Sequence, residues 1–110
     1  MPAAYSNLYL EQGTTFATTI TIDDVYGELY DLSDYDAFGQ IRKSYYSANT
    51  AAVFTASINV EHGTITLELD AETTANIAPG RYVYDAVIKN TNTTTRILEG
   101  IVDVSPMVTR

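Results

Sequence analysis

The chain of 110 residues has the size of one domain, and its six Lys and Arg against fourteen Asp and Glu give a formal net charge of −8. This charge disfavours nucleic acid and anionic membrane surfaces as partners. The absence of cysteine excludes a disulfide framework, a thiolate metal site and a cysteine nucleophile. The start of the chain has no basic and apolar leader and no window is long and apolar enough for a spanning helix, so we expect neither a secretory signal nor a membrane span.

The first half of the chain predicts three strands with turn-rich segments between them. The first covers 7–12, and the second covers 15–23, where apolar residues and threonines face opposite sides. The composition of 23–35 predicts a loop with one helical turn. A central strand is expected over 36–46, in which Gly39 marks a bulge or a close packing contact.

A hairpin and a short helix follow. The hairpin covers 53–69, because apolar residues recur at every second position on both sides of the turn Glu61-His62-Gly63. Asp70 predicts the N-cap of a helix over 71–78, and Pro79-Gly80 ends this helix.

The corner at Pro79-Gly80 leads into a strand with tyrosines two residues apart. Tyr82 and Tyr84 share one face of this strand, 81–89, so we assign both to the core. In immunoglobulin-like domains a tyrosine at such a corner bonds back to upstream backbone. The strand is expected to pair with 95–104.

These elements predict an all-β fold, an antiparallel immunoglobulin-like β-sandwich of about seven strands with one short helix before the Pro79-Gly80 corner. A single sheet as apolar as this one would leave one face unburied, which favours two packed sheets. We expect a single domain over 1–110, with short arms at 1–6 and 107–110 and with the first and last strands at sheet edges.

The only histidine, His62, lies at the tip of the predicted hairpin. A Ser-His-Asp arrangement needs a shielded histidine beside a serine, and the chain has no nucleophile-elbow pattern. We therefore predict a protein that is not an enzyme, with no catalytic residue and no cofactor.

An acidic segment, 31–36, contains Asp31, Asp34 and Asp36, and Asp23 and Asp24 are near it in sequence. Carboxylates of this kind supply the hard oxygen ligands of Ca²⁺, although the spacing of an EF-hand is absent. Solvated loop carboxylates that form local turn bonds account for the same residues. Both interpretations stay open at this point.

The segment Arg42-Lys-Ser-Tyr-Tyr46 combines cations with aromatic rings, as single-stranded nucleic acid sites do. Two cations in a chain of charge −8 instead favour a strand end where Arg42 and Lys43 pair with neighbouring acids and the tyrosines line an edge.

The nine tyrosines are too many for all of their hydroxyls to be satisfied in the core of so small a domain. Tyrosine is enriched in protein interfaces, because it combines a large rigid contact area with a polar tip. The predicted interface residues are Tyr5, Tyr9, Tyr26, Tyr30, Tyr45 and Tyr46.

Several short pieces of the sequence, in order, resemble those of a known family. They are Leu10-Glu-Gln-Gly13, Asp31-Leu-Ser-Asp-Tyr35, Gln40-Ile-Arg-Lys43, Gly63-Thr-Ile-Thr-Leu67, Pro79-Gly-Arg-Tyr-Val-Tyr-Asp85 and Leu98-Glu-Gly-Ile-Val102 before Pro106. With these pieces the chain resembles small virion structural proteins of tailed bacteriophages, and is similar to the N-terminal immunoglobulin-like sandwich domain of baseplate upper proteins.

The resemblance implies a non-enzymatic virion protein whose sandwich attaches to other phage virion proteins of the tail, baseplate, neck or fibre region. It further implies multiple copies in a symmetric assembly, located in the virion after assembly in the host cytoplasm. Two alternatives stay open: a capsid decoration protein, and a carbohydrate-binding sandwich on the virion surface whose exposed tyrosines stack on sugars.

Overall fold

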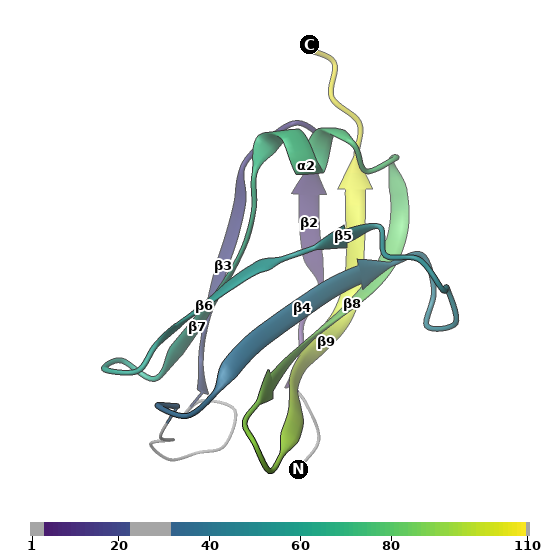
Figure 1. Cartoon of the computed structure of the whole chain (residues 1–110). Helices are drawn as coiled ribbons and strands as arrows, with labels where there is room; N and C mark the ends of the chain where they lie inside the picture. Colours follow the sequence, from purple (N-terminus) through teal and green to yellow (C-terminus); the bar gives the residue numbers. More distant parts are fainter. Residues whose placement is uncertain (1–3, 23–31, 110) are drawn as a thin grey trace.

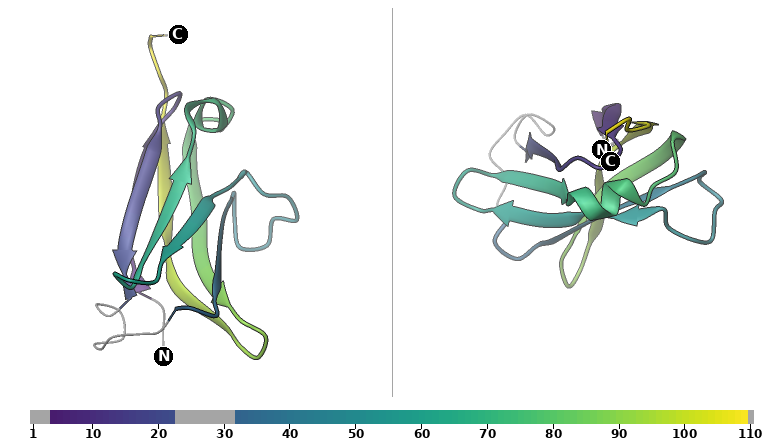
Figure 2. Two further views of the ribbon diagram at one scale, coloured as in Figure 1. Left: turned by 60° about the vertical axis from the view of Figure 1, so that its left-hand side comes forward. Right: turned by 90° about the horizontal axis from the view of Figure 1, so that it is seen from above.

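The computed structural model describes residues 4–22 and 32–109, which form two β-sheets and one short helix (Figures 1 and 2). The predicted all-β sandwich is therefore confirmed. The elements in chain order are β1 (Ala4–Tyr5), β2 (Leu8–Glu11), β3 (Phe16–Thr21), β4 (Asp36–Arg42), β5 (Ala52–Val53), β6 (Thr55–Asn59), β7 (Thr64–Leu69), α2 (Ala71–Ala75), β8 (Gly80–Lys89) and β9 (Thr94–Ser105).

The larger sheet has the order β1-β9-β8-β4-β5, and β2 also pairs with β9. The smaller sheet has the order β3-β7-β6 and packs against it. The neighbours β9, β8 and β4 on one side and β3, β7 and β6 on the other reproduce the grouping of strands in immunoglobulin domains. The helix α2 lies at one end of the sandwich, near the ends of β2 and β9 (Figure 1).

The described residues contain nine strands, where the sequence predicted about seven. One addition is β1, which pairs with Leu98 and Glu99 of β9, so Ala4 and Tyr5 belong to the sheet and not to a free arm. The other is a division of the predicted hairpin at Phe54, where the chain leaves β4 of the larger sheet and joins β7 of the smaller one. The first of these depends on a contact between segments at the two ends of the chain.

Three further details differ from the expectation. Both β1 and β2 run parallel to β9, so β9 lies inside the larger sheet and is not its edge. The central strand ends at Arg42, the last residue paired with β8, and the side chain of Arg42 donates to the carbonyls of the next loop. The helix ends at Ala75, where the N–H of the C-cap residue Asn76 bonds back to the carbonyl of Thr73.

The structure confirms the helix cap and the tyrosine corner that the sequence predicts on either side of Pro79-Gly80. The carboxylate of Asp70 accepts the N–H of Thr73 at 2.8 Å and caps α2, and the hydrogen bonds from Thr73 lower the pKa of this carboxyl. At the start of β8 the hydroxyl of Tyr82 donates to the carbonyl of Ala78 at 2.6 Å. This bond is the tyrosine corner of immunoglobulin-like sandwiches, and it fixes the course of the chain after Pro79.

A row of aromatic rings joins the two sheets across the core. Phe54 lies 6.3 Å from Phe16 of β3 and 6.2 Å from Tyr84 of β8, between ring centroids. Gly39 of β4 makes room for this row, because a Cβ there would stand 3.0 Å from the Phe54 ring. The close packing contact predicted at Gly39 is thus confirmed, and Phe54 anchors the point where the chain changes sheets.

One buried hydroxyl ties the segment between the two N-terminal strands to the core. Tyr84 points inward from β8, and its hydroxyl donates to the carbonyl of Ser6 at 2.6 Å. Gly100 of β9 lies between them, and a Cβ at this position would overlap the Ser6 carbonyl and touch the Tyr84 ring. Glycine at position 100 therefore allows the segment between β1 and β2 to approach β9 closely.

We expect Gly100→Ala to lower the free energy of unfolding by about 2 kcal/mol, because the new methyl group displaces Ser6. Tyr84→Phe removes the hydrogen bond and costs about 1 kcal/mol. Urea denaturation of both single variants and the double variant measures these costs. Since each change breaks the same contact, the double variant should lose less than the sum; strictly additive costs would show that the two residues act separately.

Burial raises the pKa of Tyr84 from 10.0 to about 12. In the unfolded chain this hydroxyl ionises near pH 10, so its contribution to stability is complete below that pH and is lost as the pH rises towards 12. We therefore expect the stability difference between wild type and Tyr84→Phe, measured by denaturant unfolding, to narrow from about pH 10 upward. A difference that stays constant up to about pH 11.5 would contradict a raised pKa.

Candidate functional site

The outer faces of the two sheets carry different chemistry. On the smaller sheet the register places hydroxyl-bearing residues side by side, and Thr19 and Thr66 share a hydrogen bond of 2.9 Å between their hydroxyls. The outward residues of this face are Ala17, Thr19, Thr21, Thr55, Ser57, Asn59, Thr64, Thr66 and Glu68. No aromatic residue is among them, so none of the predicted interface tyrosines that the structure describes lies on this polar face.

The outer face of the larger sheet carries two of the predicted interface tyrosines at its β1 and β2 side. Tyr5 is paired with Glu99 and is 61% exposed, and Tyr9 is paired with Asp103 and is 72% exposed. Paired residues of neighbouring strands share a face, so both rings stand on the outer surface beside β9. We call Tyr5 and Tyr9 the edge tyrosines.

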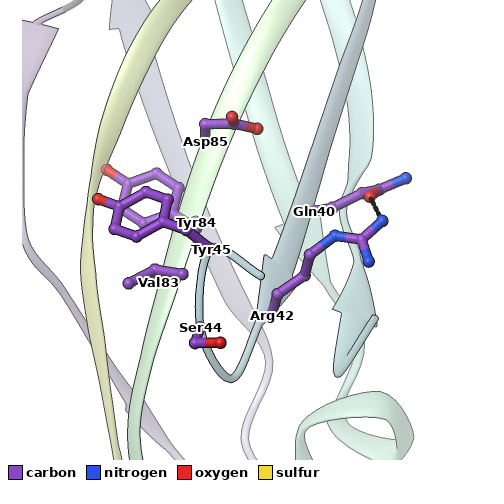
Figure 3. A pocket seen from close by; sticks show the side chains of 7 residues that line it. All are labelled: Gln40, Arg42, Ser44, Tyr45, Val83, Tyr84 and Asp85. Atoms are coloured by element: carbon purple, nitrogen blue, oxygen red, sulfur yellow. Dashed lines mark hydrogen bonds between the residues drawn. The ribbon is translucent and has the colours of Figure 1, made fainter. Parts of the chain in front are cut away.

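Two further predicted tyrosines, Tyr45 and Tyr46, lie in the loop between β4 and β5, which projects from the sandwich (Figure 2). Tyr45 is 61% exposed and borders a shallow hollow on the outer face of the larger sheet (Figure 3). Tyr46 is 98% exposed and does not border this hollow. The residues that line it are Gln40, Arg42, Ser44, Tyr45, Val83, Tyr84 and Asp85.

The structure therefore brings Tyr5, Tyr9 and Tyr45 to the outer face of the same sheet. Tyr26 and Tyr30, which were predicted with them, lie outside the described residues. Tyr82 and Tyr84 are buried, as predicted.

The hollow was not foreseen from the sequence, because its floor combines β4 and β8, more than forty positions apart. Gln40 lies directly opposite Asp85, and Arg42 lies directly opposite Val83. The Nη2 of Arg42 donates to the Oε1 of Gln40 at 2.9 Å (Figure 3). Of the parts that line the hollow, only the loop that contains Tyr45 and Tyr46 was singled out from the sequence.

Among the acids that the structure describes, none pairs with Arg42 or Lys43 as the sequence led us to expect. The Nη1 of Arg42 donates to the carbonyls of Ser47 and Ala48, at 2.8 and 2.9 Å. Lys43 donates to the carbonyl of Arg81 at 3.0 Å, and its Nζ lies 4.7 Å from the centroid of the Tyr82 ring. Within residues 4–22 and 32–109, both cations bond to backbone carbonyls, Arg42 to those of the loop and Lys43 to one of β8, and neither forms an ion pair.

Exposed ion pairs run between the edge tyrosines and the hollow. Arg81 lies 3.2 Å from Asp103, and Arg96 lies 3.9 Å from Asp85 and 3.7 Å from Glu99. Such exposed pairs contribute little to stability, at most about 1 kcal/mol each. They divide the outer face of the larger sheet into a β1, β2 and β9 side and a β8 and β4 side.

The described residues offer no grouping of three metal-binding side chains. Asp34 and Asp36 are described, whereas Asp23, Asp24 and Asp31 of the predicted acidic cluster lie outside the described residues. His62 is exposed in the turn between β6 and β7, where its backbone N–H donates to Asn59 Oδ1 at 3.2 Å. Within 4–22 and 32–109, no helix is long and apolar enough to cross a membrane.

Neither a family model nor a curated protein matches the sequence. Among solved structures, the chain is similar to the crystal structure of InlP from Listeria monocytogenes, with a TM-score of 0.49 and 17% sequence identity. The similarity covers 94% of this chain and 28% of that one. The chain thus spans between a quarter and a third of the length of that protein.

Proposed function

We propose that this protein is a non-enzymatic structural protein of a tailed-phage virion, a β-sandwich module that attaches to other virion proteins of the tail, baseplate, neck or fibre region. It acts in multiple copies within a symmetric assembly. The proposal begins from the six sequence pieces, from Leu10-Glu-Gln-Gly13 to Leu98-Glu-Gly-Ile-Val102, that resemble those of virion sandwich domains. A β-sandwich serves many unrelated functions, so the surface of the domain, and not its fold, supports the proposed attachment.

The observation that carries the attachment is the exposure of the edge tyrosines on firmly held backbone. Tyr5 and Tyr9 belong to strands paired with β9, and the Tyr84 hydroxyl holds Ser6 between them. A tyrosine on rigid backbone loses little conformational entropy when it is buried by a partner, and it contributes a large contact area. Such residues are the usual anchors of a protein interface.

The surroundings of the edge tyrosines also suit a protein partner. Ile101, half-buried on β9, provides an apolar contact next to them, and the acidic residues Glu99 and Asp103 provide a polar rim. Among the described residues β2 pairs only with β9, so its other edge can accept a strand from a partner. These features support attachment through the β1 and β2 side of the larger sheet.

The double substitution Tyr5→Ser and Tyr9→Ser tests the attachment. In particles of the phage or prophage that encodes the chain, we expect incorporation of the variant to fall at least about tenfold, because two anchoring rings are lost. Both side chains point outward, so the circular dichroism spectrum and melting temperature of the purified variant should stay close to those of wild type. Quantitative mass spectrometry of purified particles gives the copy ratio.

Tyr46→Ser is the matched control, since Tyr46 is the most exposed of the tyrosines that the structure describes and lies in the loop between β4 and β5. It should be incorporated as wild type is. Absence of the wild-type protein from particles would reject the proposed function. Normal incorporation of the Tyr5 and Tyr9 variant would reject the attachment surface.

A further inference from the structure

The strand β3 (Phe16–Thr21) forms one edge of the smaller sheet, and among the described residues it pairs only with β7. The other edge strand of this sheet, β6, lies close to β4 of the larger sheet. Apart from β7, no described strand approaches β3 to that extent. Within residues 4–22 and 32–109, the edge of β3 is therefore the open edge of the smaller sheet.

The pairing with β7 decides which backbone groups of β3 point to this open edge. The N–H of Ile22 donates to the carbonyl of Gly63 at 2.9 Å, in the register that β3 and β7 share. Hydrogen-bonded residues alternate along an antiparallel strand, so the even-numbered residues of β3 bond to β7. The N–H and carbonyl groups of Ala17, Thr19 and Thr21 therefore point into the open edge, where no described strand pairs with them.

The inward side chains of β3 are also incompletely covered. Thr18 and Ile20 are half-buried, whereas their direct partners on β7, Leu67 and Ile65, are fully buried. Both strands face the same core, but β7 has a neighbouring strand on each side and β3 has one on a single side. A further strand beside β3 would cover the apolar surface that remains.

The strand lacks the features that protect an edge from pairing. It contains no charged residue, no proline and no glycine, and its register with β7 has no bulge. Two copies of a chain with net charge −8 repel each other wherever their acids meet, and β3 has none. This edge is thus a place where two copies can meet without facing like charges.

The residues of β3 are compatible with pairing to themselves. A two-fold axis at Thr19 sets this residue opposite the partner's Thr19, and sets Ala17 opposite the partner's Thr21. Each of these pairs can exchange both N–H···O bonds, which uses the backbone groups that point outward. The side chains opposite each other on the outer face are then threonine and alanine, and cross-strand threonine pairs are favourable.

We infer that two copies of this chain pair through β3, so that their smaller sheets form one continuous sheet in the order β6-β7-β3-β3-β7-β6. The contact is isologous, since the same strand serves both copies. It extends the smaller sheet sideways and does not cover the outer face of the larger sheet, where the edge tyrosines stand. The inference concerns the contact between copies and does not rest on the proposed virion role.

Sedimentation equilibrium of the full chain tests the pairing, because a dimer doubles the mass of 12.1 kDa. We expect a reversible equilibrium between monomer and dimer, with a dissociation constant of about 100 µM or lower. A chain that stays monomeric at about 1 mM would overturn the inference. Such a result would leave the attachment through the edge tyrosines as it stands.

The symmetry of the contact gives a sharper test. Thr19→Lys and Thr19→Glu each place two like charges on the axis, so each variant alone should dimerise at least about fivefold more weakly than wild type. An equimolar mixture of the two should recover the dimer, because the new lysine of one copy then faces the new glutamate of the other. A mixture that recovers nothing would overturn the pairing at Thr19.

Ser57→Lys and Ser57→Glu are the matched controls, because Ser57 lies in the same row of the outer face but on β6. Both should dimerise as wild type does, and circular dichroism should show that all four variants are folded. Equal weakening by the substitutions at Ser57 and Thr19 would overturn the assignment to β3.

A distance measurement checks the order of the strands. Ser57, Thr66 and Thr19 form one row across β6, β7 and β3, so five strand spacings of about 4.8 Å separate the two copies of Ser57 by about 24 Å. The chain has no cysteine, so Ser57→Cys carries a single spin label for double electron–electron resonance. A main distance outside about 15 to 35 Å would overturn the continuous sheet.

The same variants distinguish a second copy from a strand of another protein. In particles, a strand from another protein would make Thr19→Lys fail to incorporate while Ser57→Lys incorporates normally, although the purified wild-type chain stays monomeric. This combination would overturn the inference in favour of a different partner at the same edge.

Discussion

The hydrogen bond from Tyr84 to the Ser6 carbonyl, made across Gly100, ties the N-terminal part of the larger sheet to the core. It joins residues 78 positions apart, and it fixes the place where the chain passes from β1 to β2. Both of these short strands then follow β9 in parallel. The edge tyrosines owe their outward position to this register, since a shift by one residue would turn their rings into the core.

A second constraint shapes the opposite side of the same sheet. Phe54 marks the point where the chain changes sheets, and it packs over Gly39 and against Tyr84, so the core aromatic row also positions β4 beside β8. Hydrogen bonds from Arg42 and Lys43 to backbone carbonyls then hold the loop that connects β4 to β5. One buried tyrosine thus supports both the edge that we propose for attachment and the hollow, while the threonine-rich smaller sheet completes the core.

The sequence predicted those parts of the fold that local pattern controls. Alternation placed β3, β7 and β8, and the Asp70 cap and the Tyr82 corner have the partners expected of them. It did not predict β1 or the parallel pairing with β9, because these depend on Gly100 and on a register between the two ends of the chain. It also missed the hollow.

The hollow was missed for a related reason. Charge pairing suggested acids as partners of Arg42, whereas its guanidinium donates to two carbonyls of the loop. The most direct test of the account is a cryo-electron microscopy map of the assembled particle. We predict that the β1 and β2 side of the larger sheet is buried against a neighbouring protein and that the hollow beside Tyr45 faces solvent. A map in which Tyr5 and Tyr9 face solvent and the threonine-rich face is buried would contradict the proposed attachment.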